Sequence, residues 1–206
     1  MELTLDRKDA LTELINIGYG RPAGALSELT GYRITLEVPQ VAMYEIELIP
    51  AMLEAMLGPV VASVSQVFTG PVSGNALLLL DEQSALVLSQ LLSEAGAEPR
   101  NFDSNAREII TEVGNILLNA CLGVFGNLLR IQVNFAVPRM RLESSARLIE
   151  AVVDANEEKL TYGLIIHTKF KVKGGDVTGY LVIVLGVPSL DRLMSELDDW
   201  ESRQLQ

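Results

Sequence analysis

Hydrophobic residues recur every three or four positions over residues 6–29 and again over 104–129, which predicts two long amphipathic helices. Shorter stretches with the same period predict helices at 47–57, 83–95, 143–153 and 188–201. Runs rich in aliphatic and β-branched residues predict strands at 33–38, 60–69, 73–80, 131–137, 159–172 and 177–185. A hairpin turn is expected at Lys173–Asp176. Each half of the chain therefore has the predicted order αβαββα.

This repetition predicts one domain made of two internal repeats, residues 1–98 and 99–206, related by a pseudo-twofold axis. Residues 96–103, which include Pro99 and several polar residues, form the expected linker. Strands that alternate with helices but also form hairpins indicate an α/β protein of the α+β kind, with a mixed or antiparallel sheet covered by helices. The two long helices are expected to lie exposed on its surface.

A polar motif is also repeated, at a constant offset of 99 residues. Each copy has an acidic residue, Glu four positions later, Asn three positions after that, and Pro after 22 further residues. The first copy consists of Asp9, Glu13, Asn16 and Pro39, and the second consists of Glu108, Glu112, Asn115 and Pro138. Because Asn is less favourable than Ala or Glu inside a helix, its presence in both copies indicates a role beyond helix formation.

Helix geometry places each set of polar groups on one face. At roughly 100° per residue, Asp9, Glu13 and Asn16 fall within an arc of about 60°. Leu11 and Leu14 lie on the opposite face, and the second helix repeats this arrangement. For one helix alone, the simpler interpretation would be an ordinary solvated face. The duplication favours a functional one.

Composition excludes several classes of protein. The formal net charge is −11 and no basic stripe is present, which argues against nucleic acid as a partner. A single cysteine, Cys121, and a single histidine, His167, argue against disulfides, a zinc site and a His-based catalytic triad. The start of the chain lacks the pattern of a secretory signal, and no apolar run approaches the roughly 20 residues of a membrane helix. A cytoplasmic protein without a membrane partner or a metal of its own is expected.

The repeated motif resembles that of the CheC/CheX/FliY family of chemotaxis phosphatases. In that family an Asp or Ser precedes the Glu, the Asn and the distant Pro. The resemblance covers essentially the whole chain, and the length and two-copy layout are most like those of CheC members. Two departures stand out: Glu108 replaces the Asp or Ser, and Pro22, one turn after Asn16, predicts a kink in the first helix.

The resemblance implies hydrolysis of the aspartyl phosphate of a CheY-type response regulator. The regulator would supply Mg²⁺ and a lysine, and phosphoryl transfer needs mainly positioning and charge stabilisation. Asn16 and Asn115 would orient the attacking water. Glu13 and Glu112 would pair with the lysine. Asp9, Glu108, Pro39 and Pro138 would support these two sites.

A second hypothesis is an adaptor that binds the phosphorylated regulator, or the protein CheD, with little hydrolysis. The resemblance implies that CheD stimulates weakly active members, and the segment Glu143–Val153 is a possible contact for it. An inactive flagellar-switch component is disfavoured because the extra C-terminal domain of FliY is missing. Outside the motif, His167 and Cys121 are interpreted as structural, and Trp200 as either a packing anchor or a contact for a partner.

Overall fold

The structure, a computed structural model, describes residues 4–30, 33–37, 40–93, 102–154, 160–172 and 175–204. In the first half, α1 (Leu5–Thr30) is followed by β1 (Thr35–Leu36), β2 (Gln40–Glu45), a 3₁₀ turn (Ile46–Leu48), α2 (Ile49–Leu57), β3 (Val61–Thr69), β4 (Gly74–Asp81) and α3 (Glu82–Leu92). In the second half, α4 (Ser104–Leu129) is followed by β5 (Asn134–Phe135), β6 (Arg139–Glu143), α5 (Ser145–Asp154), β7 (Leu160–Val172), β8 (Gly175–Gly186) and α6 (Val187–Gln204). The order of elements repeats between the halves.

All strands join one antiparallel sheet with the path β1-β7-β8-β4-β3-β5. The two halves meet at its centre, where β4 pairs with β8. They also exchange edge strands, because β2 pairs with β7 of the other half and β6 pairs with β3. Each half therefore completes the sheet of the other.

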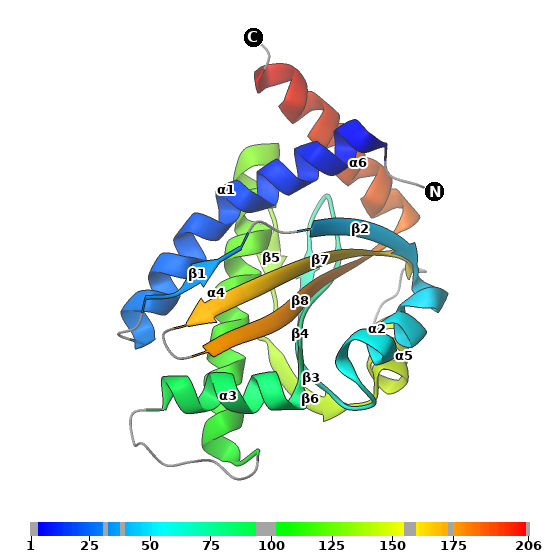
Figure 1. Cartoon of the computed structure of the whole chain (residues 1–206). Helices are drawn as coiled ribbons and strands as arrows, with labels where there is room; N and C mark the ends of the chain where they lie inside the picture. The colour runs from blue at the N-terminus through cyan, green and yellow to red at the C-terminus, as the bar shows by residue number, and fades with distance from the viewer. Residues whose placement is uncertain are drawn as a thin grey trace.

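Helices cover both faces of the sheet, in three layers (Figure 1). Successive side chains of a strand point to opposite faces, so Ala62 and Val64 of β3 pack under the layer of α1, α3, α4 and α6. Val61 of β3 and Leu77 of β4 pack instead under α2 and α5. Each face therefore has its own apolar core.

The structure confirms the fold class, the antiparallel sheet and the two long helices. The strands predicted at 33–38 and 131–137 are present but shorter, as β1 and β5, and each is followed by a strand that the sequence did not predict, β2 and β6. Pro138 lies between β5 and β6, and proline has no N–H with which to continue a ladder. Helix starts predicted at 47 and 143 were early: a 3₁₀ turn precedes α2, and Glu143 ends β6.

Some predictions concern residues outside the described ranges. Of the expected linker 96–103, only Phe102 and Asp103 are described. Lys173 and Gly174 of the expected turn also lie outside, although the flanking residues Val172 and Gly175 pair as a hairpin requires.

A bidentate ion pair joins the first and last helices. Arg7 of α1 donates from Nε to Asp198 Oδ1 over 3.1 Å and from Nη2 to Oδ2 over 2.7 Å. These hydrogen bonds lower the pKa of Asp198 below its ordinary value and raise that of Arg7. Both side chains are partly exposed, so solvent screening limits the stabilisation.

Replacing Asp198 by Asn should lower the free energy of unfolding at pH 7 by at most about 1 kcal/mol. A carboxyl group whose pKa is lowered by folding stabilises the folded state at pH values above the ordinary pKa of aspartate. This stabilisation is lost as the pH falls through the folded-state pKa. Urea denaturation should show a smaller difference in unfolding free energy between the wild type and Asp198→Asn in strong acid than at pH 7. Asp199→Asn removes the same charge one residue later and is the matched control.

Candidate active site

Helix α4 packs tightly on the sheet at a glycine. Asp103 caps the helix by accepting a hydrogen bond from the Ala106 N–H over 2.8 Å. Two turns later, Gly114 lies against Val64 of β3 so closely that a Cβ would come within 2.6 Å of that side chain. The absence of a side chain at residue 114 therefore fixes how near α4 can approach β3.

The second motif lies on the outer side of this helix. Ile110, Val113 and Leu117 are buried in the core, as the periodicity predicts. Glu108 and Glu112 are exposed, whereas Asn115 is half-buried at the boundary. One face of α4 thus presents two carboxylates to solvent with a carboxamide next to them.

Asn115 takes part in a hydrogen-bond network that reaches the sheet. Asn119, one turn later, donates from Nδ2 to Asn115 Oδ1 over 2.6 Å. Gln66 of β3, which is buried, donates from Nε2 to Asn119 Oδ1 over 3.1 Å and to the Ala136 carbonyl over 2.9 Å. These contacts fix the orientation of the Asn115 carboxamide, leaving its Nδ2 group and one oxygen lone pair for other partners.

The network ends beside the second motif's proline. Ala136 also donates its N–H to the Val67 carbonyl, which ties the segment before Pro138 to β3. Val137, between these two residues, is 83% exposed. Pro138 itself is half-buried and directly follows this exposed apolar side chain.

The first motif has a different environment. Asp9, Glu13 and Asn16 are exposed on α1, opposite the buried Leu11 and Leu14. The neighbouring Ile17 is 52% exposed. The helix continues through Pro22, and Pro39 lies outside the described residues.

Two substitutions between the repeats account for the difference. At the offset of 99 residues, Ile15 of α1 corresponds to Gly114, and Gly20 corresponds to Asn119. Ile15 is a buried, bulky residue at the position of Gly114, and Gly20 has no side chain with which to hold Asn16. The second carboxamide is held by side chains, whereas the first has no equivalent of Asn119.

Sequence reasoning missed Asn119, Gln66 and Gly114. A signal existed for the first two: Asn119 repeats an unfavourable residue type one turn after Asn115, and Gln66 is a polar residue in an otherwise apolar strand. Gly114 gave no signal that distinguishes close packing from an ordinary helical glycine.

The residues interpreted as structural are located in the core or sheet. His167 stacks on Tyr180 of the adjacent strand, with ring centroids 4.6 Å apart. Burial, together with the charge of Asp81, raises the pKa of Tyr180. Cys121 is buried in the core, and so is Trp200, which makes the tryptophan a packing anchor.

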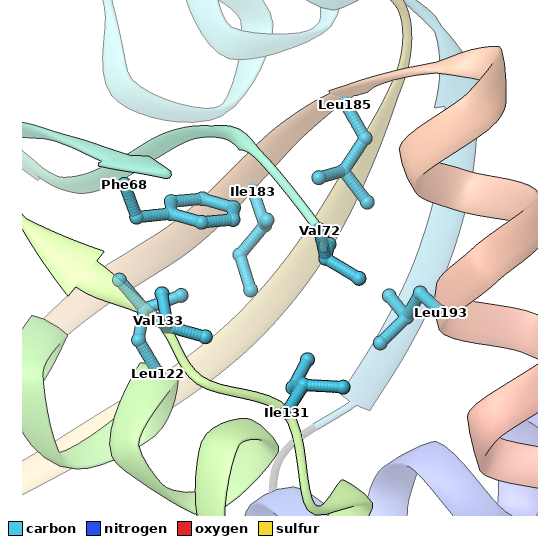
Figure 2. Close-up of a pocket in the computed structure, with 8 residues that line it drawn as sticks. All are labelled: Phe68, Val72, Leu122, Ile131, Val133, Ile183, Leu185 and Leu193. Atoms are coloured by element: carbon cyan, nitrogen blue, oxygen red, sulfur yellow. The ribbon is translucent and has the colours of Figure 1, made fainter. Parts of the chain in front are cut away.

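The interior offers little room for a substrate. The apolar cavity between the sheet, α4 and α6 measures about 10 Å³, the size of one water molecule, and eight apolar side chains line it (Figure 2). Within the described ranges, no three His, Cys, Asp or Glu side chains are grouped so that they could hold a metal ion. The motif residues lie on the surface, where they could act on a macromolecule.

No family model matches the chain. Among curated proteins, it is 24% identical over 161 residues to CheC1 of Halobacterium salinarum, covering 77% of this chain and 80% of that protein. It is also 24% identical over 147 residues to the CheY-P phosphatase CheC of Bacillus subtilis, covering 70% of each. The flagellar motor switch phosphatase FliY of the same species is 23% identical over 185 residues, with 85% of this chain and 45% of FliY covered.

Solved structures share the fold. FliY of Thermotoga maritima superposes with a TM-score of 0.77 at 19% identity, covering 97% of this chain and all of that chain. The FliM middle domain of Vibrio alginolyticus has a TM-score of 0.63 at 16% identity, covering 90% and 99%. The fold is thus the one that CheC, FliY and the FliM middle domain have in common. Together with the curated relatives, it supports the resemblance of the chain to the CheC/CheX/FliY family.

No helix in the described part of the chain combines the length and the apolar character needed to cross a membrane.

Replacing Gly114 by Ala should destabilise the protein by about 1–3 kcal/mol, because the new methyl group overlaps Val64 and forces α4 away from β3. Gly123→Ala in the same helix is a matched control. Its Cβ would meet nothing within 4 Å, so it should stabilise by up to about 1 kcal/mol. Chemical denaturation measures both, and equal effects of the two substitutions would contradict the packing argument.

Proposed function

We propose that this protein is a phosphatase that hydrolyses the aspartyl phosphate of a CheY-type receiver domain. The observation that carries the proposal is the Glu-x-x-Asn motif on both long helices, with Glu13 and Glu112 exposed and Asn115 held at the surface by Asn119. Relatives named CheY-P phosphatases support the substrate class.

In the proposed reaction, a water oxygen attacks the phosphorus in line with the bond to the aspartyl oxygen. That bond breaks, the carboxylate leaves, and inorganic phosphate carries away the oxygen of the water. The Asn carboxamide accepts a hydrogen bond from the water through its oxygen and donates to a phosphoryl oxygen through its nitrogen. The Mg²⁺ and the lysine are supplied by the receiver domain, and Glu13 or Glu112 pairs with that lysine.

Exposed apolar residues beside both motifs support a protein substrate. Ile17 follows Asn16 directly, and Val137 lies at the end of the network that holds Asn115. Either side chain could be covered by a docked receiver domain, which would exclude water from the edge of the site.

The second site is proposed to be the more active one. Positioning a water contributes to the rate only as far as the positioning group is itself held in place. Asn119 and Gln66 hold Asn115, whereas Gly20 leaves Asn16 without a corresponding partner side chain.

An adaptor that binds a phosphorylated regulator or CheD is the second candidate. The observation in its favour is the fold itself, because a neighbour with this fold was solved as a FliG–FliM complex. An adaptor would bind the phosphorylated receiver domain without shortening the lifetime of its phosphate, so the rate measurement below separates the two candidates.

Asn115→Ala should lower the rate of phosphate release from a phosphorylated receiver domain with Mg²⁺ on the order of 100-fold at the second site. Asn16→Ala should have a smaller effect, and the double variant should leave only the receiver's own hydrolysis. Asn105→Ala replaces another exposed asparagine of α4 and serves as the control. Undiminished release by the double variant would eliminate the assigned site.

Asn119 is a positioning residue under this proposal, and Asn119→Asp tests it in an Asn16→Ala background. The aspartate has nearly the same shape and still accepts from Gln66, but it cannot donate to Asn115 Oδ1. The kcat should fall on the order of tenfold with KM little changed. A purely structural role predicts instead an altered unfolding free energy with kcat preserved, and that result would exclude positioning.

A further inference from the structure

A hollow of about 380 Å³, with both polar and apolar lining, lies on the face of the sheet opposite to α4. Its floor comes from β3, β4 and β6, and one wall comes from Leu148, Ala151 and Val152 of α5. The volume falls in the range of pockets that take small organic ligands.

Two arginines stand along one side of this hollow. Arg139 and Arg141 are alternate residues of β6 and therefore point to the same face. Arg141 is 3.8 Å from Glu143, a long ion pair that offsets part of its charge, whereas Arg139 forms no ion pair within the described part of the chain. Glu143 also lines the hollow, and its Oε1 atom is buried without a hydrogen-bond partner among the described residues. The two guanidinium groups still outnumber this one carboxylate, in a chain with a net charge of −11.

A buried amide lines the same hollow. Asn75 of β4 is 3% exposed, and its Nδ2 atom has no hydrogen-bond partner among the described residues. It begins a run of aliphatic residues in the centre of the sheet, where an unpaired amide costs about 1–3 kcal/mol compared with a satisfied one. A ligand in the hollow would give this amide a partner and would explain a polar residue at this position.

The donors in the hollow match an oxyanion. Two guanidinium groups and the Asn75 amide line the space, whereas the Ser65 hydroxyl already donates to the Arg139 carbonyl, and guanidinium pairs particularly well with carboxylate and phosphate oxygens. The apolar wall from α5 suits the carbon part of such a molecule.

We propose that this hollow binds a small organic anion, a carboxylate or phosphate monoester with an apolar group, through Arg139, Arg141 and Asn75. The site lies on the other face of β3 from Gln66 and does not depend on the proposed phosphatase activity.

Titration calorimetry with the full chain tests the proposal, using phenyl phosphate and phenylacetate as probes and benzyl alcohol as the neutral control. Saturable binding of either anion supports the site, and the tighter probe identifies the preferred oxyanion. Benzyl alcohol should not bind measurably. A Kd of roughly 10 mM is the weakest affinity that would support the site. If neither anion shows saturable binding up to that concentration, the proposal is overturned.

Variants then locate the binding. Arg139→Ala and Arg141→Ala should each weaken it about tenfold, because each removes a charge-assisted hydrogen bond. Arg33→Ala removes the same charge at the opposite edge of the sheet and should leave the affinity within about twofold. Equal weakening by all three variants would show a general charge effect and would refute the site.

The Asn75→Leu variant tests ligand binding and stability in the same protein. It should abolish ligand binding while leaving the unliganded chain at least as resistant to urea as the wild type, because it removes an unpaired buried amide. Retained binding in a folded Asn75→Leu protein would exclude the amide from the site. The Asn16→Ala, Asn115→Ala double variant should bind the probes normally, which separates this proposal from the phosphatase.

Discussion

The pairing of β4 with β8 is the constraint on which the rest of the molecule depends. Leu78 faces Leu181 at the centre of this pair, and the flanking strand pairs repeat on either side of it. Because β2 and β6 then cross to the other half, neither repeat has a complete sheet alone. The same arrangement brings α1 and α4 to one face and α2 and α5 to the other, so both motifs are presented on the same side (Figure 1).

The two motif helices are symmetric in backbone and unequal in environment. Gly114 lets α4 approach β3 closely, and Gln66 of β3 donates a hydrogen bond to Asn119 of α4. On α1 the position of Gly114 is occupied by Ile15, a bulky residue. The position of Asn119 is occupied by Gly20, which has no side chain to donate a hydrogen bond. The difference between the two carboxamides therefore originates in packing, not in the motif itself.

Much of the fold could be predicted from the sequence, because long amphipathic helices such as 104–129 and paired apolar strands carry strong periodic signals. The short strands around Pro138 could not, since two and five residues give too little periodicity and their pairing is decided by distant partners. The outward face of Glu112 followed from helix geometry. The contact of Asn119 with Gln66 did not, because it joins residues 53 positions apart through a sheet register that local sequence does not encode.

A surface site of one Glu and one Asn is chemically sparse, and this sparseness limits what the protein can act on. Surface electrostatics are weakened by solvent, so such groups accelerate a reaction strongly only when a partner covers them. A phosphorylated receiver domain would bring the labile bond, the metal and the lysine, and its docking would desolvate the carboxamide. The exposed Ile17 directly follows Asn16 and would be covered by such a partner. The scarcity of His and Cys in the chain is thus compatible with hydrolysis, provided that the substrate is itself a folded protein.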